Sequence, residues 1–233
     1  MNRNVVVREI DRADPALIDG LGAAGTATVH EAIGRVGYAG ADLRPIQQNV
    51  RIAGSAVTVL SHPGDNIMIH AAVEVCREGD VLVVVNTAPS SHGMFGELLA
   101  TSLQTRGVRG LVIDAGVRDT SELREMGFPV WSRHVSCQGT VKSTADSVNI
   151  PIVLNALVVN PNDVVCADDD GVVVVPRAEA EWALAQSEAR LAKEQETRAR
   201  LARGELGVDF YGLRAKLHEL GVEYVDRLSG GTP

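Results

Sequence analysis

Hydrophobic residues along the chain gather in short, valine-rich runs, which alternate with longer segments of mixed polarity. Such runs are typical of buried strands, and they predict strands at 57–60, 81–86, 111–114, 130–132, 153–158 and 172–175. The intervening segments predict helices at 15–21, 28–33, 68–75, 96–105 and 121–126. Because strands alternate with helices, we expect an α/β protein with partly parallel strand pairing.

The pattern changes after Pro176. Residues 178–206 are rich in Ala, Glu, Arg and Leu, with charges at helical spacing, which predicts a long amphipathic helix. A second helix is expected at 209–220. A charged arm of this kind is either solvated along its length or reaches over a neighbouring subunit. We therefore expect an α/β domain at 1–177 and a C-terminal helical extension at 178–233.

Composition narrows the class of protein. A chain of 233 residues with 45% hydrophobic residues is long enough to bury a sizeable core. The net charge of −8 disfavours a nucleic-acid groove, which needs a basic surface. No apolar run is long enough to cross a membrane, and the N-terminal residues lack the apolar core of a secretory signal. We therefore expect a cytoplasmic protein with neither nucleic acid nor membrane as a partner.

The cysteines, at positions 76, 137 and 166, show no metal-site spacing. Each stands in an apolar or strand-like setting, which predicts buried thiols in a reducing compartment.

The most informative stretch is Leu111–Thr120, where a strand-like core is followed by Gly116, Arg118 and Asp119. An arginine fork can hold a carboxylate in two parallel hydrogen bonds, and a carboxylate beside it can bind a hard metal ion. The alternative is a surface ion pair in a strand-to-helix turn, with Asp119 or Thr120 as the helix N-cap. The stretch by itself supports the two interpretations equally.

A second loop, Ser90–Leu99, follows the strand predicted at 81–86. It opens a helix near Gly96, and the free N–H groups of a helix start can bind an anion. Glu97 is either a favourable partner of the helix dipole or an acidic group that faces a metal. His92 is better explained as a loop residue than as a ligand. Because the two loops follow successive strands, we expect them at the same edge of the sheet.

Two other polar loops favour a structural role. The segment Pro63–His70 predicts a turn in which Asp65 or Asn66 is the N-cap of the following helix. The alternative is that this loop forms a polar wall of a pocket. Asp168–Gly171 lacks the ligand spacing of an EF-hand, and it predicts a turn between two valine-rich strands.

The lysines also limit the chemistry. The chain has three, and they lie in polar or charged segments at positions 142, 193 and 216. A buried lysine that forms a Schiff base is therefore not expected. A lyase that acts on a carbonyl substrate would then use a metal as its electron sink.

Four segments together resemble the RraA-like family: Gly64–Asn66, His92–Ser102, Arg106–Asp119 and Gly127–Trp131. Within that family they are most similar to the class II pyruvate aldolases that act on 4-hydroxy-4-methyl-2-oxoglutarate and 4-carboxy-4-hydroxy-2-oxoadipate. The resemblance covers nearly the whole chain.

The tail bears on the choice within the family. RraA proteins that regulate ribonucleases typically stop soon after the region that matches Asp168–Pro176. The aldolases continue into a helical extension with a segment like Gly204–Tyr211, which this chain has. The tail therefore favours an enzyme over the alternative, a non-catalytic RraA-like regulator that binds a ribonuclease.

The resemblance implies a layered β/β/α RraA-like (swivelling-domain) fold and a homotrimer, or a homohexamer of stacked trimers, with sites between subunits. The helical extension would contact a neighbouring subunit. Arg118 would bind the 2-oxo acid, and Asp119 would be the direct ligand of Mg²⁺ or Mn²⁺. The backbone N–H groups of Gly96, Glu97, Leu98 and Leu99 would hold the substrate's carboxylate or keto oxygen.

The resemblance also implies acidic groups that reach the metal through water. Glu97 stands where some family members carry Asp. An acidic residue on a neighbouring subunit's C-terminal helix would complete the water shell, with Glu194 preferred over Glu196.

The implied reaction is cleavage of a small 2-oxo di- or tricarboxylic acid through a metal-stabilised pyruvate enolate, with oxaloacetate decarboxylation as a side activity. The setting would be bacterial degradation of aromatic compounds. The matched motifs do not determine whether the substrate carries the methyl or the carboxymethyl branch, or which metal is native. They also do not identify the general base or distinguish a trimer from a hexamer.

Overall fold

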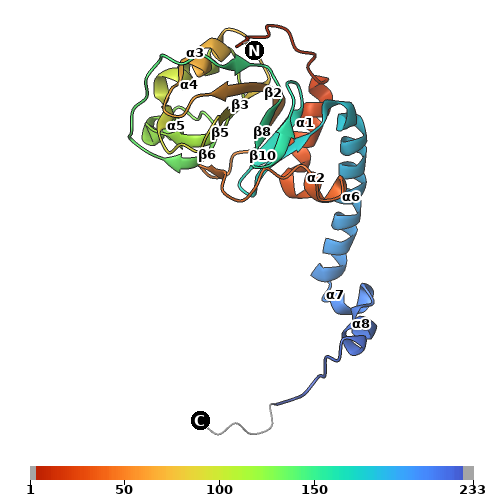
Figure 1. Cartoon of the computed structure of the whole chain (residues 1–233). Coiled ribbons are helices and arrows are strands. Elements are labelled where there is room, and N and C mark those ends of the chain that lie inside the picture. Colours follow the sequence, from red (N-terminus) through yellow and green to blue (C-terminus); the bar gives the residue numbers. More distant parts are fainter. Residues whose placement is uncertain (1–3, 228–233) are drawn as a thin grey trace, which may run out of the picture. The chain divides into compact units, whose positions relative to one another are not determined.

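One mixed sheet organises the first part of the chain in the computed structural model, which describes residues 4–227 (Figure 1). In the order β1-β6-β5-β3-β2-β10-β11, its strands are Arg44–Pro45, Val130–Val135, Gly110–Val117, Asp80–Asn86, Ile52–Ser61, Val164–Asp168 and Gly171–Val175. Two short strands join it from the side: β4 (Gly93–Phe95) pairs with β5, and β7 (Ser147–Val148) pairs with β2. The neighbours β2, β3, β5 and β6 pair in parallel, as the alternating pattern predicted.

Helices cover one face of the parallel strands. These are α3 (Ile67–Val73), α4 (Glu97–Gln104) and α5 (Thr120–Glu125). The alternation of side chains along each strand divides the core: in β3, Leu82 and Val84 pack with the helices, whereas Val81, Val83 and Val85 face the other way. Buried aliphatic side chains on both faces explain why the strands read as continuous hydrophobic runs.

The opposite face is covered by strands. A hairpin of β8 (Ile152–Leu154) and β9 (Leu157–Val159) places Ile152, Leu154 and Val159 in the same core as Val83 and the inner side chains of β10 and β11. The sequence predicts one strand over 153–158, and this is wrong. Asn155 and Ala156 both adopt positive φ angles, of 48° and 65°, and they turn the chain back on itself. The result is a layered β/β/α arrangement, which confirms the predicted α/β class.

A third hydrophobic cluster lies beside this sandwich. It joins α1 (Pro15–Ala24), α2 (Thr26–Ala32) and the first turns of α6 (Ala180–Ala202) to the outer face of β10 and β11. A single turn of 3-10 helix, Arg177–Glu179, leads into α6. Ala180 and Ala183 are fully buried, so the beginning of α6 belongs to the core of this first unit.

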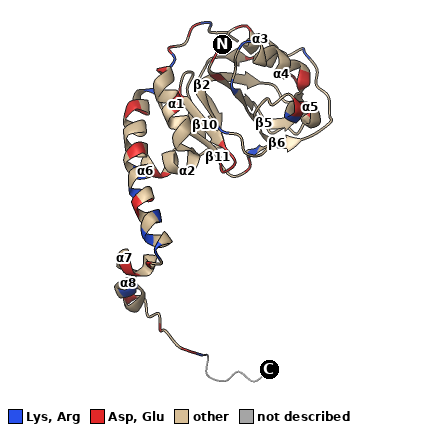
Figure 2. Ribbon diagram, turned by 180° about the vertical axis from the view of Figure 1, so that it is seen from behind, with Lys and Arg blue, Asp and Glu red and all other residues tan. Residues whose placement is uncertain are grey.

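The chain divides into two compact units, the first ending at Arg190 and the second beginning at Leu191. Both acidic and basic residues lie along α6 (Figure 2), which confirms a long charged helix. The helix predicted at 209–220 is instead two, α7 (Gly207–Phe210) and α8 (Leu213–Glu219), because Gly212 adopts a left-handed φ of 67°. The division at 177/178 and the contact of the extension with a neighbouring subunit stay predictions.

Within the second unit, local contacts hold the helices. Arg200 forms an ion pair with Glu205 at 2.8 Å, and its guanidinium lies 4.2 Å from the centre of the Phe210 ring. Among the described residues from 191 to 227, none is buried. No helix between residues 4 and 227 is long and apolar enough to cross a membrane.

Candidate functional site

The turn after β5 places Arg118 and Asp119 against the start of α4. The Arg118 amide donates to the Phe95 carbonyl at 2.9 Å. Asp119 has a left-handed backbone, with φ 53° and ψ 40°, and occupies the N-cap position of α5 without making a side-chain cap. Its Oδ2 instead accepts a hydrogen bond from the Glu97 amide at 3.2 Å. The N-cap interpretation is therefore right about the position and wrong about the hydrogen bond, because the carboxylate serves a different helix.

A β-bulge in β5 precedes this turn. Strand β5 pairs with β3 as far as Ile113, and β4 takes over as its neighbour at Gly116. Between these positions Asp114 and Ala115 oppose a single residue of β6, Arg133. The Arg133 guanidinium forms an ion pair with Asp114, and this pairing raises the arginine's pKa. The bulge on the β6 side of β5 and the exchange of β3 for β4 on its other side therefore fall at the same residues, just before Arg118.

Glycine is required where the two turns meet. A side chain at Gly96 would collide with Oδ2 of Asp119. At Gly93, it would collide with the Ser136 carbonyl and come within 3.2 Å of the Arg118 Cβ. The main chain therefore approaches another backbone at Gly93, and the Asp119 carboxylate at Gly96, more closely than a residue with a Cβ allows.

A shallow pocket of ≈ 360 Å³ opens in front of the pair, lined by Arg118, Asp119, Val135, Ser136 and Cys137. The two charged side chains keep 43% and 39% of their surface exposed, and Arg118 Nε lies 3.7 Å from Asp119 Oδ2. An ion pair this exposed contributes little to stability. Both groups are therefore accessible to a ligand.

As predicted, the start of α4 lies at the same edge of the sheet as the turn after β5. The residues at this helix start differ in their exposure and contacts. Leu98 is largely exposed, whereas Leu99 is buried. The Glu97 carboxylate accepts a hydrogen bond from the Thr101 hydroxyl at 3.0 Å, one turn along the helix. The amides of the first helical turn have no acceptors within the helix, and that of Glu97 is bonded to Asp119. The roles predicted for Gly96, Glu97, Leu98 and Leu99 stay predictions.

The loop before α3 serves both as a turn and as an anchor. Asp65 is fully buried, and its Oδ1 accepts from the Ile67 amide at 3.0 Å. Its Oδ2 accepts from the amides of Ser143 and Thr144, each at 2.7 Å. Burial acts to raise the pKa of Asp65, but the hydrogen bonds outweigh it and hold the pKa below its usual value. The bonds to 143–144 span the fold, so no local pattern could have shown them.

The arrangement suits a cation that is held mainly by water. Within residues 4–227, no three His, Cys, Asp or Glu side chains come together as a metal-binding group. Mg²⁺ commonly binds through one or two carboxylates and keeps several waters, so the single half-exposed carboxylate of Asp119 fits a hydrated divalent ion. Glu194 and Glu196 lie on the part of α6 that belongs to the second unit, and the role predicted for Glu194 beside a neighbouring subunit stays a prediction.

The other acidic turn is structural, as predicted. Asp168 and Gly171 face each other across the turn between β10 and β11. The Asp168 carboxylate accepts from both the amide and the hydroxyl of Thr26, and from the Asp170 amide.

The cysteines divide into two kinds. Cys76 and Cys166 are buried, and burial raises the pKa of each thiol to about 12. Cys137 is exposed in the wall of the pocket. The prediction of three buried thiols is therefore wrong for Cys137, because strand β6 ends at Val135 and the chain leaves the core there.

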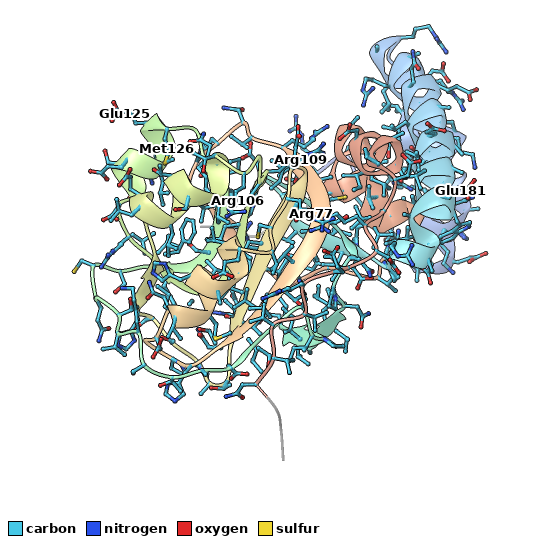
Figure 3. The ribbon with its side chains drawn as sticks, turned by 90° about the horizontal axis from the view of Figure 1, so that it is seen from above. Arg77, Arg106, Arg109, Glu125, Met126 and Glu181 are labelled. Atoms are coloured by element: carbon cyan, nitrogen blue, oxygen red, sulfur yellow. The ribbon has the colours of Figure 1, made fainter. Side chains whose placement is uncertain are left out.

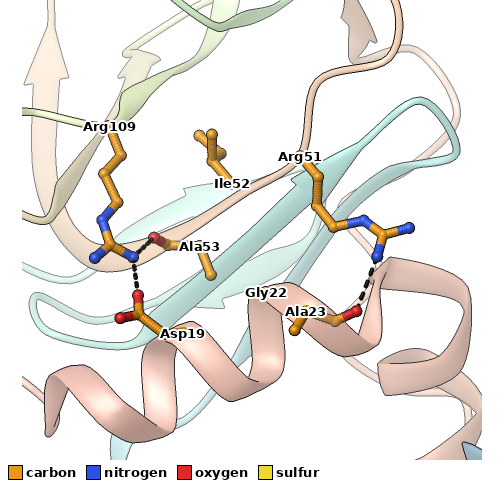
Figure 4. A pocket seen from close by; sticks show the side chains of 7 residues that line it. All are labelled: Asp19, Gly22, Ala23, Arg51, Ile52, Ala53 and Arg109. Atoms are coloured by element: carbon orange, nitrogen blue, oxygen red, sulfur yellow. Dashed lines mark hydrogen bonds and ion pairs between the residues drawn. The ribbon is translucent and has the colours of Figure 1, made fainter.

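A second hollow, of ≈ 390 Å³, lies at the opposite edge, where β2 and β5 begin (Figure 4). Arg77, Arg106 and Arg109 lie in the connections that lead into β3 and β5 (Figure 3). In the hollow, Arg51 donates to the Ala23 carbonyl at 2.8 Å, and Arg109 donates to the Ala53 carbonyl at 2.9 Å. Arg51 and Arg109 thus provide donors for carbonyls at the end of α1 and the start of β2, so we assign these two arginines a structural role.

The protein has a layered α/β fold. Its candidate site, the pocket at Arg118 and Asp119, lies at the carboxyl end of the parallel strand β5. The family model described as RraA-like, Aldolase/RraA matches residues 26–174. The chain therefore belongs to the RraA-like family, as its motifs predicted.

Two relatives of this chain carry the name of an aldolase. A protein of Halalkalibacterium halodurans is 26% identical over 153 residues, which cover 66% of this chain and 73% of that protein. One of Burkholderia multivorans is 33% identical over 132 residues, covering 57% and 80%. Both are named "Putative 4-hydroxy-4-methyl-2-oxoglutarate aldolase".

Among solved structures, Streptomyces coelicolor RraAS2 aligns with a TM-score of 0.73 at 27% identity, over 82% of this chain and 99% of its own. It is described as an unusual member of the RNase ES inhibitor RraA protein family. This likeness confirms the predicted RraA-like fold.

Proposed function

We propose that this protein is a divalent-metal-dependent aldolase that releases pyruvate from small 2-oxo acids. Its substrates would be 4-carboxy-4-hydroxy-2-oxoadipate, cleaved to pyruvate and oxaloacetate, or 4-hydroxy-4-methyl-2-oxoglutarate, cleaved to pyruvate, or both. The observation that carries the proposal is the contact of Asp119 with the first amide of α4 at 3.2 Å. That contact places the start of α4 beside the accessible pocket that the Arg118 guanidinium and the Asp119 carboxylate line. The names of the two relatives support the same reaction.

Arg118 would bind the 2-oxo acid end of the substrate. Its guanidinium can hold a carboxylate through two parallel hydrogen bonds, and its side chain lines the pocket. When the bond between C3 and C4 breaks, negative charge develops on the pyruvate enolate. A fixed cation beside that charge stabilises the transition state more than the ground state.

Asp119 would hold the metal, Mg²⁺ or Mn²⁺. Its Oδ2 is fixed by the Glu97 amide, so the carboxylate is oriented before any ion arrives. When bound, the ion would supply Lewis-acid polarisation of the substrate's 2-keto oxygen. The amides of Leu98 and Leu99, at the positive end of the helix dipole, would face the substrate's anionic end.

We further propose that the working form is a trimer or a hexamer of stacked trimers. Glu97 and the Glu194 carboxylate of a neighbouring subunit would hydrogen-bond to water around the metal. The lone carboxylate of Asp119 supports this arrangement, because one protein ligand leaves a hydrated ion with waters that need acceptors. A cytoplasmic enzyme of aromatic-acid degradation fits these substrates.

The test is pyruvate release by the purified protein from oxaloacetate and from both hydroxy acids. We expect turnover to disappear with EDTA and to return with added Mg²⁺ or Mn²⁺. The ratio of kcat/KM between the two hydroxy acids would assign the preferred branch. No turnover on any of the three compounds with either metal would overturn the proposal.

The likeness to RraAS2 supports a second candidate, a non-catalytic regulator of a ribonuclease. It predicts inhibition of an RNase E-type enzyme by the purified protein, independent of EDTA. Inhibition together with absent turnover would favour this candidate over the aldolase.

A further inference from the structure

The wall of the candidate pocket belongs to a segment that crosses the fold after β6. This segment, residues 136–144 and here called the strap, connects the end of β6 to β7 and passes α4 and α3 (Figure 1). At its near end, the Ser136 amide donates to the Val117 carbonyl at 2.9 Å, one residue before Arg118. Ser136 and Cys137 line the pocket. The strap therefore shapes the space in front of Arg118.

The strap also packs against the groups that support Arg118. The Gly93 amide donates to the Gln138 carbonyl at 2.8 Å. A Cβ at Gly139 would lie 3.8 Å from Arg118 Nη1, in ordinary van der Waals contact. Movement of the strap would therefore change both the wall of the pocket and the surroundings of the guanidinium.

The far end of the strap is held by a buried carboxylate, that of Asp65, and by main-chain hydrogen bonds to the same loop. Asp65 accepts from two strap amides, those of Ser143 and Thr144, and from the Ser143 hydroxyl at 3.2 Å. Beside it, the Val141 amide donates to the Gly64 carbonyl at 2.9 Å, and the Asn66 amide donates to the Val141 carbonyl at 3.1 Å. The strap residues from 141 to 144 are exposed, so these polar contacts, rather than apolar burial, keep this end in place.

We infer that Asp65 is a positioning residue for the candidate site, which anchors the strap so that the pocket wall and Arg118 keep their places. This rests on the proposed function for its effect on turnover. A carboxylate is needed because both Oδ atoms act only as acceptors, and Oδ2 serves three donors. An asparagine at position 65 keeps the size of the side chain but presents an NH₂ group to one of these donor sets. Either the Ile67 amide or the strap donors then lose their acceptor, so the junction between the loop before α3 and the strap is weakened while the size of the side chain stays the same.

The test compares Asp65→Asn with a matched control, Asp163→Asn. Asp163 is also a buried carboxylate bonded to main-chain amides, those of Asn160 and Arg177, but it precedes β10 and lines no part of the pocket. We expect Asp65→Asn to speed hydrogen exchange in residues 136–144 and to raise the KM for oxaloacetate about tenfold or more, as misplaced binding groups do. Asp163→Asn should destabilise the protein and leave both readouts unchanged.

Cys137 supplies an internal reporter, since it is the exposed thiol of the pocket wall while Cys76 and Cys166 are buried. Its reaction rate with a thiol reagent should change in Asp65→Asn and not in Asp163→Asn. If Asp65→Asn fails to fold, Thr144→Pro removes one donor from the exposed strap and should shift exchange and KM in the same direction. Unchanged strap exchange and unchanged KM in a folded Asp65 or Thr144 variant would overturn the inference. If the wild-type protein has no turnover, the proposed function fails, while the exchange and thiol rates still decide whether Asp65 anchors the strap.

Discussion

Asp119 and Asp168 both stand in acidic turns at the ends of strands, and both invite a metal-binding interpretation from sequence. In the structure their carboxylates have different surroundings. Asp168 is buried, and both oxygens are occupied by Thr26 and by the Asp170 amide. Asp119 is half-exposed, with one amide on Oδ2 and a guanidinium nearby. The same residue type therefore serves the fold in one turn and is accessible to a ligand in the other.

The difference lies in the saturation of the oxygen atoms. A buried carboxylate persists only when hydrogen bonds replace its lost hydration, and a saturated one has no capacity left for a ligand. Asp65 resembles Asp168 in being buried and saturated with hydrogen bonds. It differs because the donors to its Oδ2 belong to the strap, whose other end lines the pocket. Saturation identifies structural carboxylates, and the elements that they join decide whether they matter to a site.

The largest effect is expected for Arg118→Ala. Removing a fixed charge-stabilising group commonly costs about 10²–10³-fold in kcat, and we expect kcat/KM for oxaloacetate to fall by at least that much. Thermal unfolding should change little, because the side chain is half-exposed. Arg51→Ala, which removes a half-exposed arginine at the opposite edge, is the matched control. A near-wild-type rate in Arg118→Ala would remove the central claim.

Next in size is Asp168→Ala, which should act on stability alone. It leaves the buried amide and hydroxyl of Thr26 without their acceptor, at a cost of about 2–3 kcal/mol in the free energy of unfolding. Urea unfolding measures this loss, and kcat at a permissive temperature should stay within about twofold of wild type. A large fall in kcat in the folded variant would erase the contrast between the two turns.

A smaller effect on rate is expected for Gly96→Ala. The added methyl group collides with Oδ2 of Asp119, so the carboxylate must turn away from the Glu97 amide. We expect kcat/KM to fall about tenfold and the Mg²⁺ concentration for half-maximal rate to rise. Gly139→Ala, whose methyl group would meet only ordinary contact with Arg118, should change the rate much less. Equal effects of the two alanines would argue against a specific clash at Asp119.

The smallest effect concerns pH. Because the pKa of Asp65 is lowered in the folded protein, its ionised form contributes stability above its unfolded pKa of about 3.9. That contribution is lost as the pH falls through the folded pKa. The difference in unfolding free energy between wild type and Asp65→Asn should therefore be present at pH 7 and shrink below about pH 4. A difference that is constant from pH 7 to pH 3 would contradict the lowered pKa.

Much of the fold could be predicted from sequence because its signals are local. Buried parallel strands appear as valine-rich runs, and these located β2, β3, β5, β6 and β11. The hairpin at 152–159 was missed because its turn places an alanine, Ala156, at positive φ, which no propensity predicts. Local spacing also suggested that the turns before α4 and α5 share an edge.

The contacts inside the site could not be predicted, because they depend on tertiary structure. The bond from the Glu97 amide to Asp119 joins two turns that the sequence shows only separately. The anchor of the strap joins Asp65 to Ser143 across much of the chain. Cys137 stands next to a valine-rich strand and still emerges at the surface. In each case the packing of distant segments decides the contacts or the exposure of the residue, and a local sequence pattern does not contain that information.

The left-handed backbone of Asp119 has a consequence for how this position can evolve. Glycine and asparagine adopt such angles at little cost, whereas β-branched residues are strained there. Neither glycine nor asparagine carries a charge, so every substitution that the backbone tolerates well removes the carboxylate. A lineage that lost the chemistry could keep the fold with Asn or Gly at position 119. A lineage that kept both the fold and the chemistry would have to retain aspartate at this position.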